Sequence, residues 1–136
     1  MRPYRVKPYT VPSWIHRALL SLRPAERLPV SKWAEKWRVL PDTNAIPGPF
    51  RNSVTPYLAE IMDAFSNEVE RIVFVKPTQV GGTTALENML ASAIDQDPAP
   101  TMIVYPSKEL AERTVEAKLE PMIRQCKPLA AKYREA

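Results

Sequence analysis

Apolar residues in the second half of the chain follow two spacings, one typical of buried strands and one typical of helices. Residues 69–75 (VERIVFV) and 101–106 (TMIVYP) are short and rich in β-branched residues, as strands buried in a parallel sheet are. Each is followed by apolar positions three or four residues apart, over 83–94 and 108–123, which predicts two helices. The inner face of the first helix is expected to carry Leu86, Met89, Leu90 and Ala93. This order predicts an α/β fold that begins as a parallel sheet, one βαβ unit plus a helix.

The first half of the chain combines short helices with many prolines. Helices are predicted over 14–22, 32–37 and 57–65. Ser31 is the expected cap of the second helix. Eight of the 15 prolines lie between Pro3 and Pro49, and proline restricts its own backbone and that of the residue before it. We therefore predict a proline-rich, partly helical arm over residues 1–53 and a folded domain over residues 54–136.

Charge is distributed unevenly between these two parts. The arm carries ten Lys or Arg residues against three acidic residues, a net charge of +7, whereas residues 54–136 carry a net charge of −3. A basic arm favours an anionic partner such as nucleic acid. The alternative is a soluble arm that binds nothing or binds another protein, and the sequence leaves both interpretations open.

Two residue types exclude several chemistries because each occurs once. Cys126 alone allows neither a disulfide framework nor a cysteine metal site, and His16 alone excludes Ser-His-Asp, Cys-His and paired-histidine sites. No apolar run approaches the roughly 20 residues that a membrane span needs. The basic N-terminus lacks the continuous apolar stretch of a signal peptide, so we expect a cytoplasmic protein.

The stretch KPTQVGGTT, residues 76–84, lies between the first predicted strand and the helix that follows it. Aligned with the phosphate-binding pattern G-x-x-x-x-G-K-[ST] (Walker A), it has the second glycine at Gly81 and the hydroxyl at Thr83. Gly82 occupies the position of the lysine, whereas Lys76 stands at the position of the first glycine. The stretch is either a nucleotide site whose lysine has moved to the front of the loop or an ordinary strand-to-helix turn.

A nucleotide site of this kind depends partly on the backbone, because amides of the loop and of the helix N-terminus bind phosphate whatever the side chains are. Thr83 can offer an oxygen to Mg²⁺, and the long ammonium side chain of Lys76 can reach the phosphates across the loop. Because position 82 faces the phosphates in this interpretation, we expect Gly82→Lys to be tolerated. The candidate nucleotide-binding residues of the loop are Lys76, Gln79, Val80, Gly81, Gly82, Thr83 and Thr84.

Five stretches, in order over roughly residues 28–125, carry a likeness to a known family. They are SKWAEKWRVLP, PGPFRNSVTPYLAEIMDAF, VERIVFVKPTQVGGTTALENML, DPAPTMIVYPSKELAE and LEPMI. With them the chain resembles the large-subunit terminases of tailed phages, in the branch related to the lambda packaging enzyme. The family's loop often reads P-x-Q-V-G-K-T, from which this chain departs at Gly82. Because the lysine of terminases can stand at the start of the motif, the resemblance implies that Lys76 replaces it.

The resemblance implies a P-loop NTPase-type fold and the function of a viral DNA-packaging motor. In such an enzyme an N-terminal ATPase domain uses ATP and Mg²⁺ to move double-stranded DNA into the capsid, and a C-terminal metal-dependent endonuclease domain cuts the DNA. The implied partners are double-stranded DNA, the small terminase subunit and the capsid portal, with no membrane. The implied location is the cytoplasm of the host cell.

The chain is short for such an enzyme. No apolar strand ending in paired acidic residues (Walker B) follows Ile123, and no carboxylates cluster as a two-metal nuclease requires. We therefore expect the chain to be the N-terminal part of the ATPase domain, with a partial parallel sheet. We also expect it to hold no catalytic residue and to be inactive alone.

Three further residues gain a role from the resemblance. Tyr57 and Arg51 lie in the element that contacts adenine in this family, and Lys108 lies in a motif near the nucleic acid track. Two alternatives remain open: Tyr57 packs in the core at a helix start, and Lys108 lies on a solvated helix face.

Two other functions also remain open. A helicase-like DNA translocase shares the fold and the ATP site. Such a protein does not need the segment SKWAEKWRVLP…PGPFR that precedes the predicted domain here. A non-enzymatic assembly module with a degenerate phosphate loop would bind no nucleotide.

Overall fold

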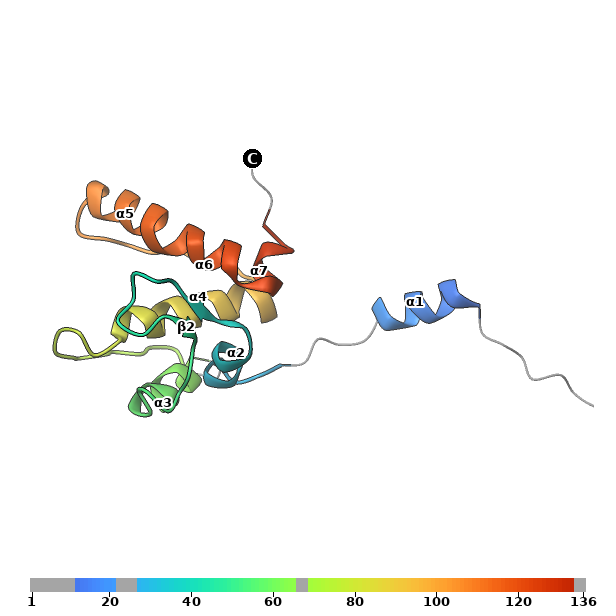
Figure 1. Cartoon of the computed structure of the whole chain (residues 1–136), viewed down its shortest axis with the longest axis horizontal. Coiled ribbons are helices and arrows are strands. Elements are labelled where there is room, and N and C mark those ends of the chain that lie inside the picture. Colours follow the sequence, from blue (N-terminus) through green and yellow to red (C-terminus); the bar gives the residue numbers. More distant parts are fainter. Residues whose placement is uncertain (1–11, 22–26, 66–68, 134–136) are drawn as a thin grey trace, which may run out of the picture.

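The computed structural model describes residues 12–21, 27–65 and 69–133 (Figure 1). Residues 1–11 and 22–26 of the predicted arm lie outside the described residues. The first predicted helix is present as α1 (Ser13–Ser21). It stands apart from the other helices in Figure 1 and leaves the side chains of Trp14 and Leu19 exposed.

The centre of the structure is built by helices that pack against one another. They are α2 (Val30–Trp37), α3 (Tyr57–Ala64) and α4 (Gly82–Gln96), with α7 (Lys127–Ala130) packed on α4. The largest fully buried apolar side chains include Trp33, Leu58, Met62, Met122 and Leu129. Since α2 supplies buried residues to this core, the second half of the predicted arm packs with residues 54–136.

Helix α2 is attached to its neighbours by side-chain hydrogen bonds. It begins at Val30 after Pro29, so Ser31 is not the cap that the sequence predicted. The amide and the hydroxyl of Ser31 instead donate to the two carboxylate oxygens of Asp63 in α3, at 2.8 Å each. The indole Nε1 of Trp33 donates to Asp95 of α4 at 2.8 Å. These bonds fix α2 against both helices.

The predicted parallel sheet is not present in the described residues. The sheet found there is an antiparallel pair, β1 (Val39–Leu40) and β2 (Gly48–Pro49), with Val39 opposite Pro49 and Leu40 opposite Gly48. Segments 69–75 and 101–106 are extended but pair with no strand.

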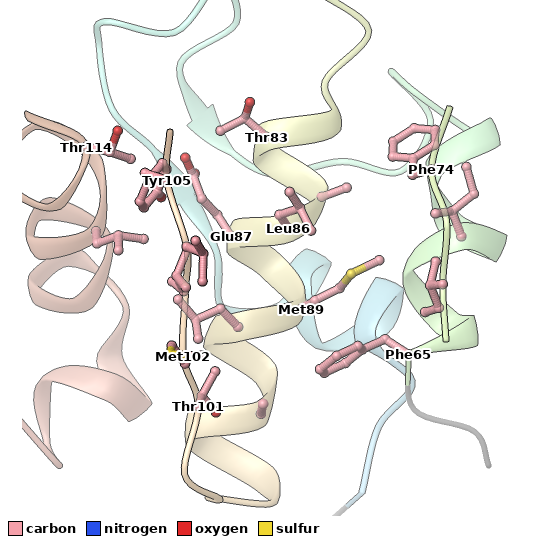
Figure 2. A pocket seen from close by; sticks show the side chains of 18 of the residues that line it. Phe65, Phe74, Thr83, Leu86, Glu87, Met89, Thr101, Met102, Tyr105 and Thr114 are labelled. Carbon is pink, nitrogen blue, oxygen red and sulfur yellow. The ribbon is translucent and has the colours of Figure 1, made fainter. Parts of the chain in front are cut away.

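The reason lies in where these two segments run. Figure 2 shows them on opposite sides of α4, with Phe74 on one side and Met102 and Tyr105 on the other. A strand needs a neighbour for its backbone hydrogen bonds, and the two segments stand apart as opposite walls of a groove that α4 also lines. Their apolar side chains are accordingly exposed, to 91% at Val75 and 86% at Met102.

The helix predicted over 108–123 is present but changes its winding along its length. It comprises α5 (Lys108–Thr114), a π-helical turn η1 (Val115–Leu119) and α6 (Glu120–Gln125). Ser107 caps it by accepting a hydrogen bond from the Leu110 amide at 3.2 Å. Met122 of α6 is buried, whereas α5 contributes no buried residue. The helices predicted over 57–65 and 83–94 are confirmed as α3 and α4.

Candidate nucleotide-binding site

Residues 78–81 form a turn that leads directly into the 15-residue helix α4. Two residues of the turn have a positive φ, Gln79 at 61° and Gly81 at 76°. Gly81 is the N-cap of α4, and its carbonyl accepts a hydrogen bond from the Ala85 amide at 2.9 Å. Helix geometry leaves the first amides of α4 without intrahelical acceptors, and the helix dipole adds partial positive charge at the same end. The turn therefore favours an anion.

The N-terminal end of α3 supports this loop. A Cβ atom at Gly81 would lie 2.9 Å from the Cδ1 atom of Leu58, and the positive φ independently favours glycine there. The Tyr57 hydroxyl donates to the carbonyl of Val80 at 3.2 Å. The Tyr57 side chain is 52% exposed, so it lies at the loop surface and not in the core.

Lys76 lies across the start of α4. Its Cδ and Cε atoms occupy the space that a Cβ atom at Gly82 would need, so its alkyl stem crosses the first residue of the helix. The side chain is exposed, and no hydrogen bond or ion pair engages its ammonium within the described part of the chain. The structure thus places the alkyl stem of this front-of-loop lysine at the N-terminus of α4.

The hydroxyl residues of the loop differ in exposure. Thr83 is exposed at the first turn of α4 (Figure 2), and Thr84 is half-buried. Gln79 is exposed in the turn, and Val80 beside it is half-buried.

Two predicted residues are not connected to the loop by any hydrogen bond or ion pair of the described residues. Arg51 is exposed in a turn, where its carbonyl accepts from the Val54 amide at 3.2 Å. Lys108 is exposed on α5 and pairs with Glu112 one turn away, at 3.6 Å. This surface pair agrees with the solvated-face interpretation of Lys108.

An apolar groove of ≈ 600 Å³ runs beside α4. Its walls are the two extended segments on either side of the helix, and Thr83 lies at one end (Figure 2). Leu86 and Met89 of α4 also line it. Leu86 is 61% exposed, although the helical pattern placed it on the inner face. Apolar side chains of segments 69–75 and 101–106 and of α4 therefore face solvent in this groove, although the sequence predicted that a sheet and the helix packed on it would bury them.

A buried ion pair that the sequence analysis did not identify joins α4 to the residue before β1. Arg38 is 2% exposed and donates from Nη2 to Glu87 at 2.7 Å and from Nε to the side-chain oxygen of Asn88 at 3.2 Å. Its Nη1 donates to the Val39 carbonyl at 3.1 Å. Burial lowers the pKa of Arg38, and the Glu87 carboxylate opposes that shift. In the sequence, this cluster is indicated only by the adjacent polar residues Glu87 and Asn88 within an otherwise largely apolar helix.

Within the described ranges no three or more His, Cys, Asp or Glu side chains are grouped so that they could hold a metal ion. None of the helices described there is long and apolar enough to cross a membrane.

A left-handed glycine at the N-terminus of a long helix, preceded by an extended segment, is typical of proteins that bind nucleotide phosphates. The comparison with known families is more specific. Residues 44–136 match the sequence model of the family described as phage terminase large subunit gpA, ATPase domain. The chain belongs to this family, which confirms the terminase resemblance and implies that the domain uses a nucleotide. No curated protein and no solved structure matches the chain significantly.

Proposed function

We propose that this chain is the nucleotide-binding part of a DNA-packaging motor and that residues 76–84 hold the phosphates of ATP. The observation that carries the proposal is the position of Lys76. Its side chain lies over the N-terminus of α4, with an ammonium that has no partner among the described residues. In a member of a terminase ATPase family, that ammonium is available to an anionic ligand.

Each part of the loop has a distinct role in this proposal. The amides of Gly82, Thr83 and Thr84 donate to phosphate oxygens, and the helix dipole stabilises the negative charge. Lys76 neutralises part of that charge in place of the lysine missing at position 82. Thr83 is exposed and supplies the hydroxyl oxygen to the Mg²⁺ that accompanies ATP.

The adenine base is assigned to the surface beside Tyr57. This ring is exposed and is attached to the loop through the Val80 carbonyl, so a base stacked on it would lie within reach of the phosphate site. Arg51 is the second candidate for the base, as a polar contact from an exposed turn.

We also propose that segments 69–75 and 101–106 are strands of a parallel P-loop NTPase-type sheet in the intact domain. Both segments are extended, have no strand partner among the described residues and expose β-branched side chains. The apolar groove between them, with α4 along it, fits further strands of that sheet. Completing the sheet would cover the exposed apolar side chains.

In the intact enzyme, hydrolysis of ATP would drive double-stranded DNA into a capsid in the cytoplasm of the host cell. The proposed partners are DNA, the small terminase subunit and the portal, and a separate nuclease domain would cut the DNA. Lys108 is the candidate for a DNA phosphate contact on this chain. A helicase-like translocase is the alternative with the same ATP site, and an assembly module without nucleotide is the alternative from another class.

A titration with a fluorescent ATP analogue tests the proposal. The full chain is expected to bind the analogue, and Lys76→Ala is expected to weaken binding by about tenfold to a hundredfold, the equivalent of a charged hydrogen bond of about 1.5–3 kcal/mol. The matched control is Lys108→Ala, which removes an exposed lysine outside the loop. Absence of binding by the full chain favours the assembly module, and equal affinity of Lys76→Ala and the unchanged chain contradicts the role of Lys76.

A further inference from the structure

We infer that Gly82 is the positioning residue for Lys76, and that side chains at positions 76 and 82 compete for one space. The inference rests on the proposed function, because it assigns to Gly82 the task of directing the lysine to the phosphate site. It explains why this loop has a lysine at its front and a glycine in the place of the usual lysine.

The two glycines of the loop are required for different reasons. Gly81 has a φ of 76°, a conformation that residues with a Cβ rarely adopt. Gly82 is the first residue of α4 and has no such φ, so its backbone alone does not require glycine. What a Cβ atom at Gly82 would meet is Lys76, whose Cδ and Cε atoms already fill that position.

This contact confines the lysine. Lys76 follows an extended segment and would otherwise sample many rotamers in solvent, because its side chain is exposed. The bare Cα of Gly82 lets the alkyl stem lie flat against the helix start. The edge of Phe74 closes the same space, with its Cε1 atom 3.1 Å from the Cβ position. The stem is thereby directed across the N-terminus of α4, where the free amides are.

The structure therefore changes the expectation for Gly82→Lys. The sequence predicted that this substitution is tolerated, because position 82 faces the phosphates. In the folded loop, a lysine at 82 has space for its Cβ atom only when the stem of Lys76 is absent or has moved aside. The loop accommodates one lysine, at its front or at its back, and Gly82→Lys alone displaces Lys76.

A double-mutant cycle with a fluorescent ATP analogue tests this. Gly82→Ala is expected to weaken binding about as much as Lys76→Ala, and the double variant is expected to bind no more weakly than Lys76→Ala. Lys76→Ala combined with Gly82→Lys is expected to regain most of the lost affinity. Losses that add in the double variant would show that the two residues act independently and would overturn the inference.

A second readout does not depend on nucleotide. The effect of Gly82→Ala on the urea midpoint of unfolding is measured in three backgrounds: unchanged, Lys76→Met and Lys76→Ala. Methionine keeps a long stem over Gly82, whereas alanine removes it. We expect Gly82→Ala to lower the urea midpoint more, or raise it less, in the unchanged and Lys76→Met backgrounds than in the Lys76→Ala background. In the Lys76→Ala background only Phe74 lies against the new methyl group.

The two readouts separate the inference from the function on which it rests. If the unchanged chain does not bind the analogue, the proposed function fails. The unfolding data then still decide whether the stem of Lys76 occupies the space at Gly82. Equal shifts of the midpoint in all three backgrounds would overturn the inference even if nucleotide binds.

Discussion

The ion pair between Arg38 and Glu87 allows a quantitative test of how α4 is held in place. We consider Arg38→Met, which keeps an unbranched side chain but removes every donor. Arg38 is 2% exposed and Glu87 8% exposed, so the carboxylate would lose its buried partner. The side-chain oxygen of Asn88 and the Val39 carbonyl would each lose a donor as well.

The expected loss of stability follows from these contacts. A hydrogen bond to a charged group contributes about 1.5–3 kcal/mol and a neutral one about 1 kcal/mol. Removing one partner of a buried ion pair costs about 3–5 kcal/mol, because the other charge stays buried without compensation. We therefore expect Arg38→Met to lower the free energy of unfolding by about 3–5 kcal/mol, a large part of the total of about 5–15 kcal/mol for a typical domain.

The assay is urea unfolding followed by far-UV circular dichroism. The matched variant is Arg38→Met combined with Glu87→Met, which replaces both charges by apolar groups and is expected to recover most of the loss. Lys108→Ala, which breaks an exposed pair, is expected to change the free energy of unfolding by no more than about 1 kcal/mol. A loss below about 1 kcal/mol for Arg38→Met would refute the reasoning, because it would place the pair in contact with water.

Three further predictions concern activity, the boundary of the core and pH. The chain alone is expected to hydrolyse ATP no faster than background, because the sequence after Ile123 shows no apolar strand that ends in paired acidic residues; a turnover of about 1 s⁻¹ would contradict this. Removal of residues 1–26 is expected to leave cooperative unfolding intact, whereas removal of residues 1–38 is expected to abolish it, since Val30, Trp33 and Arg38 are buried. Burial raises the pKa of the Cys126 thiol above its usual 9.0, so above pH 9 the unfolded chain loses this proton first. The free energy of unfolding is therefore expected to fall there as pH rises, more steeply than in Cys126→Ala, and identical pH profiles would contradict the prediction.

The helices could be predicted because their signal is local. Apolar residues three and four positions apart predicted α4 close to its observed ends, and the helix predicted over 57–65 is observed as α3. The sheet could not be predicted in the same way. The β-branched runs do favour extended backbone, but pairing requires a neighbouring strand, and in the described residues the two candidates stand apart as walls of the groove beside α4.

The predicted inner face of α4 is confirmed at Met89, which is buried in the core, and at Leu90, which packs against it, but it is wrong at Leu86. Periodicity favoured Leu86, yet Leu86 is 61% exposed in the groove and Asn88 is fully buried. An amide is tolerated in that position because Arg38 donates to it from 50 residues earlier in the chain. The helix pattern itself carries no information about such a partner.

Residues far from α4 in the sequence also hold this helix in place, and the candidate phosphate loop leads into it. In the proposed function the phosphates of ATP bind at the N-terminus of α4, so the position of α4 determines where they would lie. It is held in the middle by Arg38, at its end by Trp33 through Asp95, and by Gln96, which accepts from and donates to the backbone of Leu28 at 2.6 and 2.9 Å. All three partners come from residues 28–38, which overlap the stretch SKWAEKWRVLP. That stretch is therefore part of the support of the candidate nucleotide site, because it fixes the helix on which the site is built.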